Sequence, residues 1–488
     1  MCIPLVLLLW LLSIPFFINA AIPQPKGFLL NCGGPEFIIA ENGLNFIPDH
    51  GYISVGNITS VKKPDVLPLL KTLRFFPDTA SRKYCYTFPV IKGRKFLIRT
   101  TYYYGDFDGK KEPPVFDQII EGTRWTIVNT TEDYANGLSS YYEIIVTAHR
   151  KSLSVCLARN ENTVSCPFIS ALEVIYLKKS LYSSTDFDKY GLSMVARASF
   201  GSDEDIISYP DDAFNRDWQP FMDGNVAEKS HSNISTSGFW NIPPAKAFAT
   251  AITASQAQTL TVKWPPFPLP DSIYYVAFYF QESRSPGVSV YSMEWPLKGQ
   301  VEIVMNPRED MDVGPLINAG EIFQILPLGG RTVTRDVKAM EKLAKSLKNL
   351  PPDWNGDPCL PKQHSWTGVT CSEEKNTRII SLNLTSFGIS GTLPKDIANL
   401  TAISSLWLGG NKLSGTIPDM SSLKALKSLH LEDNKLEGSI PQSLGVVPKL
   451  QEVFLQNNNL TGSIPNNLAN KKEINLQVSG NNLSYGKE

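Results

Sequence analysis

The stretch DWNGDPCLPKQHSWTGVTC, Asp353–Cys371, divides the chain into two parts of different character. The sequence before it is irregular and rich in aromatic residues, whereas the sequence after it repeats every 23 or 24 residues. Pro351 and Pro352 end any preceding helix, because proline lacks the amide donor and clashes with the preceding turn. Cys359 and Cys371 bracket a short loop. Because the first unit of a repeat array would otherwise leave its core open to water, this stretch is predicted to cap the array.

The repeats after this cap share a strand pattern in which leucine or valine alternates with a variable residue. The strands are Leu382–Leu384, Leu406–Leu408, Leu429–Leu431, Val453–Leu455 and Leu476–Val478, and asparagines recur at Asn411, Asn434, Asn458 and Asn481. The aliphatic side chains are expected to face a core, each contributing about 1.5–3 kcal/mol on full burial. The asparagine side chains can bond backbone groups that no ladder satisfies. Residues 376–488 are therefore predicted to form a short leucine-rich-repeat solenoid.

The sequence before the cap is predicted to be mostly β. Its segments rich in β-branched and aromatic residues, bounded by turn residues, lie at 94–100, 142–147 and 171–177 and again at 260–262, 274–280 and 301–305. This spacing favours two β-sandwich lobes in tandem. We place them at residues 22–182 and 183–332, so that the fold class is mostly β, with paired lobes followed by the solenoid.

One helix is expected between the lobes and the repeats, within residues 333–350. Its apolar side chains recur at three-to-four spacing, at Val337, Met340, Leu343, Ala344 and Leu347. Thr334 is the expected N-cap. The apolar stripe is predicted to pack on the second lobe or on the cap, which makes the disulfide-capped junction, residues 351–375, a semi-rigid joint.

The amino terminus predicts secretion. An apolar run from Ile3 to Ile18 is followed by small residues, so residues 1–21 are expected to be a cleaved signal peptide. A retained membrane anchor is the alternative, because the run is long. We expect passage through the secretory pathway and an extracellular or cell-surface location, associated with the plasma membrane if a span follows or the segment is retained.

Six cysteines remain after that segment. Pairing of nearest neighbours gives Cys32–Cys85, Cys156–Cys166 and Cys359–Cys371, although six cysteines allow fifteen connectivities. Buried free thiols are the alternative. Seven N-glycosylation sequons favour the same compartment, and they lie at Asn57, Asn129, Asn233, Asn383, Asn399, Asn459 and Asn482.

Composition excludes several classes of function. The 488-residue chain carries 46 basic and 47 acidic residues, a formal net charge of −1. No block of five like charges occurs, so no nucleic-acid partner is expected. The histidines have no metal-ligand spacing, and neither a metal nor a cofactor is predicted.

The motifs carry a family resemblance over essentially the whole mature chain. They are Asn31–Gly34, Arg74–Pro77, Tyr84–Tyr86, Tyr104–Gly109 and Pro167–Glu173 in the first lobe, Tyr209–Asp212, Arg216–Trp218, Phe280–Glu282 and Pro315–Glu321 in the second, and Gly356–Cys359 at the junction. In this order they resemble the extracellular part of plant malectin-like, leucine-rich-repeat receptor kinases. The resemblance implies a tandem malectin-like region followed by repeats, displayed outside the cell. No kinase motif occurs in this sequence, so we expect no enzymatic activity from it.

The variable strand residues of the repeats form the main candidate site. They face outward on the concave surface, in a column of Asn383, Trp407, His430, Phe454 and Gln477. Exposed aromatic residues are enriched where partners bind, although isolated ones are common. We therefore predict partner binding at Trp407, His430, Phe454 and Gln477. A glycan at Asn383 would crowd the end of this column.

A second candidate lies in the first lobe. Tyr102, Tyr103 and Tyr104, with Asp106, could form a stacking platform for a sugar. Alternate residues of a strand face opposite ways, so at least one ring is expected in the core. The segment Asp106–Gly109 resembles a calcium loop only faintly and is interpreted as a turn.

These observations predict an extracellular recognition module of a plant receptor or receptor-like protein. Its expected partner is a peptide, a protein or a co-receptor ectodomain in cell-surface signalling. The alternative is a cell-wall carbohydrate-binding protein that holds a glycan through the malectin-like lobes. A glycan array would separate the two.

Overall fold

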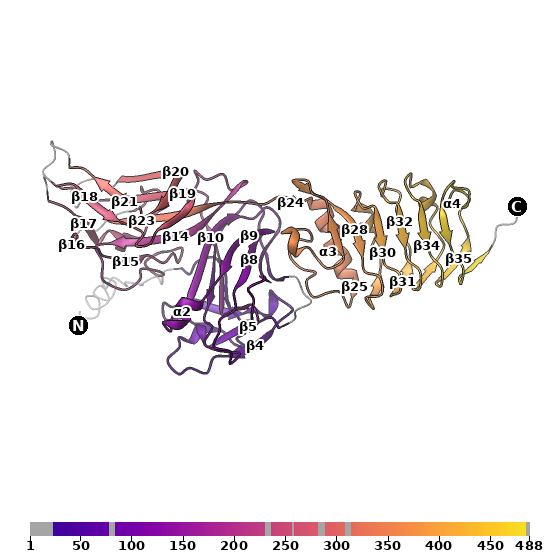
Figure 1. Cartoon of the computed structure of the whole chain (residues 1–488), viewed down its shortest axis with the longest axis horizontal. Helices are drawn as coiled ribbons and strands as arrows, with labels where there is room; N and C mark the ends of the chain where they lie inside the picture. The colour runs from indigo at the N-terminus through magenta and orange to yellow at the C-terminus, as the bar shows by residue number, and fades with distance from the viewer. Residues whose placement is uncertain are drawn as a thin grey trace, which may run out of the picture.

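The computed structural model describes residues 23–77, 83–229, 236–255, 258–281, 288–307 and 314–484. The predicted signal peptide and the sequon at Asn233 lie outside these residues. The molecule is elongated, with two β lobes at one end and a solenoid that continues along the long axis (Figure 1). The predicted fold class, mostly β with paired lobes ahead of a repeat solenoid, is confirmed.

A single sheet of eleven strands runs through both lobes. In spatial order its strands are β2 (Ile38–Ile39), β3 (Asn45–Pro48), β1 (Gly27–Asn31), β13 (Ala171–Leu177), β7 (Lys95–Tyr102), β10 (Ser140–Thr147), β14 (Tyr190–Phe200), β23 (Ala319–Pro327), β19 (Leu269–Phe280) and β20 (Val288–Gly299), and β15 (Gln219–Phe221) pairs with β14. The lobes meet where β10 pairs with β14, with Ile144 opposite Ser193 and Ile145 opposite Leu192. The lobes are therefore joined by backbone hydrogen bonds as well as by side chains.

Smaller sheets complete the lobes. They contain β6 (Tyr84–Pro89), β11 (Ser152–Arg159), β8 (Phe116–Ile120) and β9 (Thr123–Val128); β12 (Phe168–Ile169), β5 (Thr72–Phe75) and β4 (Asn57–Ser60); β16 (Val226–Lys229), β17 (Thr250–Thr253) and β22 (Leu316–Ile317); and β18 (Leu260–Lys263) with β21 (Glu302–Met305). The short helices are α2 (Thr131–Ala135), η1 (Asp49–Gly51), η2 (Pro68–Leu70) and η3 (Ala245–Phe248). The cores between the layers are rich in Phe and Tyr.

Buried charges cross the boundary between the lobes. Arg197 lies on β14 and is 2% exposed. Its guanidinium donates to Glu143 on β10 and to Glu321 on β23, each at 2.7 Å. Arg99 on β7 donates to the other oxygen of Glu143 at 2.8 Å. These carboxylates keep buried cations paired, which is the condition under which a protein interior tolerates charge.

Helix α3 (Thr334–Ser346) connects the lobes to the repeats. The prediction that Thr334 caps it is wrong, because the N-cap is Val333, which offers no side-chain acceptor, and Thr334 is already helical. Met340 and Leu343 belong to the core of the repeats. Of the two packing partners expected for the apolar stripe, the repeat side is therefore the one observed. Buried Asp336 holds the helix to the first repeat by accepting from Arg378 at 2.9 Å and from the Ile379 amide at 3.0 Å.

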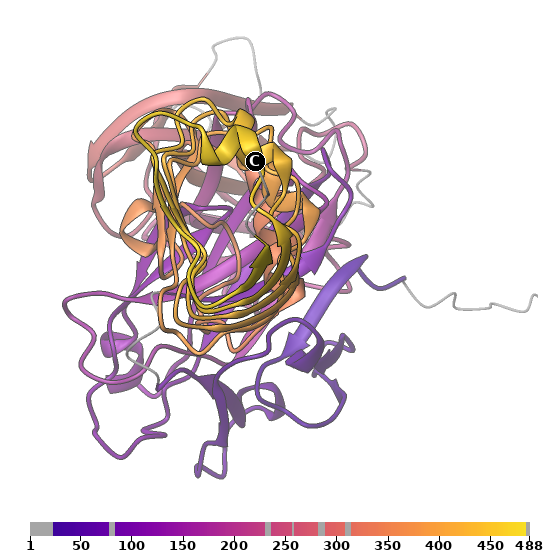
Figure 2. The same cartoon turned by 90° about the vertical axis from the view of Figure 1, so that its right-hand side faces the viewer.

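The repeats form two sheets that face each other across an aliphatic core. In each sheet the first strand pairs antiparallel with the second, and the strands of successive repeats pair in parallel. The first begins at the cap and contains β26 (Val369–Cys371), β28 (Ile379–Asn383), β30 (Ser405–Trp407), β32 (Ser428–His430), β34 (Glu452–Phe454) and β36 (Asn475–Gln477). The second contains β25 (Leu347–Lys348), β29 (Ser390–Thr392), β31 (Lys412–Thr416), β33 (Lys435–Gly438), β35 (Asn459–Ser463) and β37 (Asn482–Ser484). A short pair is formed by β24 (Arg331–Thr332) and β27 (Asn376–Thr377). The short helices of this region are η4 (Lys362–His364), η5 (Lys395–Asn399), η6 (Gln442–Val446) and α4 (Asn466–Ala469). Viewed along the array, successive coils superpose (Figure 2).

The recurrent asparagines join neighbouring repeats as predicted. The Asn458 side chain donates to the carbonyls of Leu431 at 3.0 Å and Leu455 at 3.1 Å and accepts from the Leu436 amide at 2.9 Å. Asn434 and Asn411 make the equivalent bonds one and two repeats earlier, respectively. Each side chain thus satisfies backbone groups of two adjacent repeats.

Candidate partner-binding surface

The variable strand residues of the repeats form one straight column, which we call the aromatic column: Asn383, Trp407, His430, Phe454 and Gln477. Parallel pairing of β28, β30, β32, β34 and β36 sets these residues directly beside one another in that order. The leucines and valine on either side of the first four are buried, and Leu476 and Val478 beside Gln477 are half-buried. The alternation of a strand therefore turns the column outward, onto the face of the first solenoid sheet.

The three rings in the column stack on each other. The ring centroids of Trp407 and His430 are 5.5 Å apart with planes inclined by 20°, and those of His430 and Phe454 are 4.3 Å apart and inclined by 18°. All three side chains are half-buried. Because the rings support one another, the column offers a flat and stiff apolar strip, and a partner that binds it orders few side chains.

Four polar atoms in and beside the rings lack hydrogen-bond partners among the described residues. Trp407 Nε1, His430 Nε2, Glu432 Oε2 and Gln456 Oε1 are shielded from solvent and form no hydrogen bond with any residue in the described parts of the chain. His430 Nε2 lies 3.4 Å from Glu452 Oε2, close enough for an ion pair but without hydrogen-bond geometry. A shielded polar atom left unpaired costs about 1–3 kcal/mol, so this face gains when a partner supplies the missing bonds.

Glu432 and Gln456 were missed by the sequence analysis. Each follows the second core leucine of its strand, in the column next to the rings. The Glu432 carboxyl lies over Gly409, where a Cβ would come within 2.2 Å of its Oε1. A repeat alignment could have found this column, because Gly409, Glu432 and Gln456 occupy the same position of successive repeats.

The tyrosines proposed as a sugar platform lie in the core of the first lobe. Tyr102, Tyr103 and Tyr104 are 0%, 7% and 1% exposed, respectively. Tyr102 packs against Phe116 and Phe168 with centroids 5.7 and 5.8 Å away. The prediction of an exposed stacking platform is therefore wrong, because the whole segment turns inward where β7 ends.

Asp106 lies in the turn after these tyrosines. It adopts a φ of +58°, and its side chain accepts from the Lys111 amide at 2.8 Å. This geometry agrees with the interpretation of Asp106–Gly109 as a turn. Within the residues that the structure describes, no group of three His, Cys, Asp or Glu side chains could hold a metal ion.

The predicted cysteine pairing is wrong in the first lobe. Cys85 bonds to Cys156, and Cys32 and Cys166 are free. Cys85 on β6 lies directly opposite Cys156 on β11, with the two Cα atoms 4.0 Å apart, although 71 residues separate them in the chain. Nearest neighbours along the chain were therefore not nearest neighbours in the sheet. The junction bridge, Cys359–Cys371, forms as predicted.

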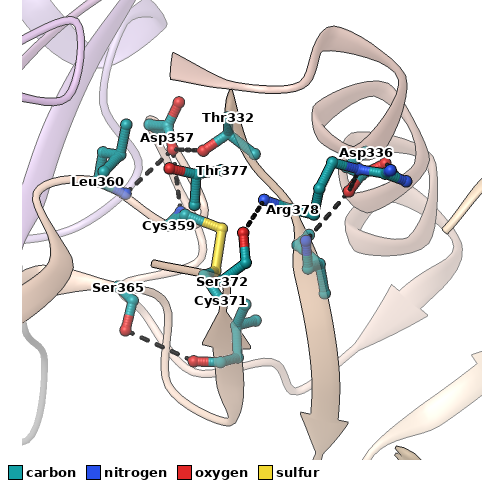
Figure 3. The surroundings of a disulfide bond; sticks show 12 residues. Thr332, Asp336, Asp357, Cys359, Leu360, Ser365, Cys371, Ser372, Thr377 and Arg378 are labelled. Carbon is teal, nitrogen blue, oxygen red and sulfur yellow. Dashed lines mark hydrogen bonds and ion pairs between the residues drawn. A yellow bond between two sulfur atoms is a disulfide. The ribbon is translucent and has the colours of Figure 1, made fainter. Parts of the chain in front are cut away.

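The junction binds the first lobe as well as the repeats. Asp357 accepts from the amides of Cys359 and Leu360 at 2.9 and 3.0 Å, beside the disulfide and within reach of Thr332 (Figure 3). Its other oxygen receives Arg150 of the first lobe at 2.7 Å. One buried carboxylate thus ties the cap, the end of the second lobe and the first lobe together.

Two further contacts close this joint. Lys83 of the first lobe is completely buried and donates to the carbonyl of Leu360 at 2.9 Å. Gly356 has a φ of +66°, and a Cβ there would lie 2.7 Å from the Cys85 sulfur. Only glycine allows the junction to approach the lobe disulfide this closely. The sequence analysis predicted a semi-rigid joint and placed Gly356 in the junction motif, but it did not predict these contacts with the first lobe.

The sequon asparagines that the structure describes are all exposed: Asn57, Asn129, Asn383, Asn399, Asn459 and Asn482. Asn383 stands at the first-repeat end of the aromatic column, beside Trp407. A glycan at Asn383 would confine a partner to the later part of the column.

The geometry defines a class of protein: a module of paired β lobes joined firmly to a disulfide-capped leucine-rich-repeat solenoid. The chain belongs to the malectin-like domain family, whose family model matches residues 30–289. The family models for the leucine rich repeat N-terminal domain and the leucine rich repeat match residues 333–372 and residues 425–446 and 449–471, respectively.

The comparisons with individual proteins agree with this assignment. The chain is 29% identical over 427 residues to the probable LRR receptor-like serine/threonine-protein kinase PAM74 of Arabidopsis thaliana, a match that covers 78% of this chain and 47% of the relative. The chain thus spans about half the length of the curated relatives it matches. Within the described parts of the chain, no helix is long and apolar enough to cross a membrane.

Solved structures share the fold of the lobes. The crystal structure of the ANXUR1 extracellular domain from Arabidopsis thaliana has a TM-score of 0.51 and 16% identity, covering 62% of this chain and 97% of that chain. The crystal structure of the plant peptide RALF23 in complex with FER and LLG2 has a TM-score of 0.50 and 17% identity, covering 62% of this chain and 96% of that chain.

Proposed function

We propose that this chain is a plant cell-surface recognition module and that its aromatic column binds a peptide or the ectodomain of a co-receptor. The observation that supports this most directly is the stack of Trp407, His430 and Phe454, with four shielded polar atoms in and beside it that form no hydrogen bond within the described residues. Large aromatic side chains are enriched at the centre of protein interfaces. The function is binding rather than catalysis.

The comparisons support the partner class. One protein that shares the lobe fold is seen in complex with a peptide and a second protein. The curated relatives are named as receptor-like kinases with leucine-rich repeats. The site proposed here lies on the repeats. The structural match covers 62% of this chain, and the proposal does not depend on that protein having the same repeats.

The test is a binding screen with the secreted chain. A panel of purified receptor-like ectodomains and secreted peptides is measured by biolayer interferometry against the wild-type chain and against Trp407→Ala/Phe454→Ala. The matched control, Val446→Ala, removes an apolar side chain that is 54% exposed on another side of the solenoid. A true partner loses a few kcal/mol of affinity with the double variant and none with the control.

A partner that binds the double variant with unchanged affinity would refute the column as its site. A glycan array with the same proteins addresses the carbohydrate alternative. Saturable binding of a glucan that persists in the double variant would move the function to the lobes.

A further inference from the structure

A second hollow lies on the first lobe, away from the aromatic column. Its volume is about 630 Å³, and we call it the basic groove; its lining residues are Lys26, Phe28, Pro89, Val90, Ile91, Arg94, Phe96, Lys151 and Tyr176. That volume is within the range of sites that hold drug-sized ligands. The lining side chains are mostly half-buried or exposed, so the groove is an open channel rather than a closed cavity.

Four separate segments build the groove at one end of the lobe. Lys26 precedes β1, the turn between β6 and β7 supplies Ile91 and Arg94, β11 begins beside Lys151, and β13 ends beside Tyr176. Backbone bonds fix them together: the Val90 amide donates to the Lys151 carbonyl at 3.0 Å, and the Tyr176 amide donates to the Lys26 carbonyl at 2.7 Å. The groove is therefore a preformed feature of the sheet ends.

The floor of the groove is apolar and aromatic. Phe28, Phe96 and Tyr176 supply rings, with the centroids of Phe96 and Tyr176 6.2 Å apart. Ile91 stands at the rim and is 66% exposed, although a β-turn ordinarily carries polar residues. An exposed isoleucine next to a ring-lined hollow offers apolar contact to something outside the chain.

The charge around this floor has one sign. Lys26, Arg94 and Lys151 line the groove and no carboxylate does, although the chain as a whole carries 46 basic and 47 acidic residues. No ion pair joins any of the three to a carboxylate in the described parts of the chain. The Arg94 guanidinium lies 4.9 Å above the Tyr176 ring and donates to its hydroxyl, so one cation is already held over the floor.

We propose that the basic groove binds an acidic peptide segment through one apolar or aromatic side chain. The ring-lined floor takes the apolar side chain, and the three cations face the carboxylates on either side of it. A peptide fits better than a small acid, because the groove is open and its cations are spread over three chain segments.

The experiment uses isothermal titration calorimetry of the secreted chain with the unlabelled peptide Asp-Asp-Phe-Asp-Asp. We expect saturable binding that weakens as salt rises, because the contacts at the rim are exposed ion pairs. Arg94→Gln/Lys151→Gln is expected to raise the Kd at least tenfold, and Ile91→Ser severalfold. The matched control, Lys263→Gln/Lys298→Gln, removes two cations from exposed positions on the second lobe and is expected to change the Kd less than twofold.

Specific outcomes would overturn the proposal. If Asp-Asp-Ser-Asp-Asp bound equally well, the groove would not recognise an apolar side chain. If phenylacetate bound equally well, the ligand would be a small aromatic acid and not a peptide. An absence of saturable binding, or an unchanged Kd with the groove variants, refutes the site. A concentration-dependent dimer that Ile91→Ser abolishes would assign the groove to a second copy of the chain. Trp407→Ala/Phe454→Ala should leave this Kd unchanged, which keeps the two sites experimentally separate.

Discussion

The lobes and the repeats of this chain build their interiors in opposite ways. From Ile379 to Leu468 the buried cluster of the solenoid consists only of Leu, Ile, Val and Met. The lobes instead mix many Phe, Tyr and Trp side chains with aliphatic ones and also bury paired charges. A repeat only has to match its neighbour, whereas the lobes must bring together strands that are distant in the chain.

The two regions also satisfy their buried polar groups differently. In the solenoid, neutral asparagine amides bond backbone carbonyls at one position in each repeat. In the lobes, single charged residues link several elements: Glu143 accepts from both Arg99 and Arg197. This difference predicts that substitutions in the solenoid destabilise mainly the neighbouring repeats. In the lobes, loss of one buried charged residue leaves its partner as an unpaired buried charge.

The largest effect should come from Arg197→Ala in the lobes. The change leaves Glu143 without one buried partner and Glu321 without its cation, and breaking such a pair costs about 3–5 kcal/mol. Urea unfolding followed by hydrogen exchange should show earlier opening of β14 and β23, while the repeats keep their protection. The control Lys298→Ala removes one partner of an exposed pair and should change stability by less than about 0.5 kcal/mol. Equal loss of protection in both regions would show that they unfold as one unit.

The two disulfides extend the comparison. The lobe bridge Cys85–Cys156 spans 71 residues and the junction bridge Cys359–Cys371 spans 12. The chain-entropy model gives about 4 kcal/mol for the longer loop and about 3 kcal/mol for the shorter one. Replacing each pair by serine and measuring thermal unfolding should therefore destabilise the lobes more than the cap. The opposite order would mean that the cap depends on its bridge for packing and not only for chain entropy.

The repeats could be predicted almost completely from the sequence. Their strands follow from the alternation of leucines, and the register of Trp407, His430 and Phe454 follows from the repeat length. The stack of rings does not follow from that pattern, because side-chain torsions decide whether neighbouring rings lie face to face. The strand pattern alone also did not single out Glu432. The equivalent residue of the preceding repeat is Gly409, so the position is recognised as a column only when the repeats are aligned.

The arrangement of the lobes could be predicted only as a class. The strands at 142–147 and 171–177 appear where expected, but the merged sheet and the Cys85–Cys156 bridge depend on contacts between distant segments. The junction residues escaped prediction for the same reason. Lys83 and Asp357 are 274 residues apart in sequence, and no local pattern marks them as neighbours.

A smaller effect is expected from Asn458→Ala in the repeats. The change leaves the carbonyls of Leu431 and Leu455 and the Leu436 amide without their partner. Unpaired buried groups cost about 2–3 kcal/mol here, less than a stranded charge in the lobes. Hydrogen exchange should rise in the repeats on either side of Asn458 and not in the lobes. The control Gln451→Ala, at an exposed position, should stay within about 0.5 kcal/mol.

The smallest effect concerns pH and the joint where the two regions meet. Glu121 accepts from the Ser154 amide at 2.8 Å and lines a cavity of about 20 Å³ with His149, Arg150 and Arg331. Burial raises the pKa of Glu121 to about 7, against the opposing pull of the Arg150 cation. Burial also lowers the pKa of His149 to about 4, helped by the Arg331 cation. Titration of Glu121 and of His149 therefore changes the free energy of unfolding in opposite directions as pH rises.

The sign follows from the protons bound in each state. Between the unfolded pKa of about 4.3 and the folded pKa of about 7, folded Glu121 keeps its proton and unfolded Glu121 loses it, so its contribution to stability is complete below that window and disappears as pH rises. His149 acts in the opposite direction, which is why the difference between wild type and Glu121→Gln is the quantity to measure. Urea unfolding at pH 6.0 and 7.5 should show wild type losing about 1 kcal/mol relative to the variant. If that difference stays constant with pH, the Glu121 carboxyl is already ionised in the folded lobe and does not make the joint sensitive to pH.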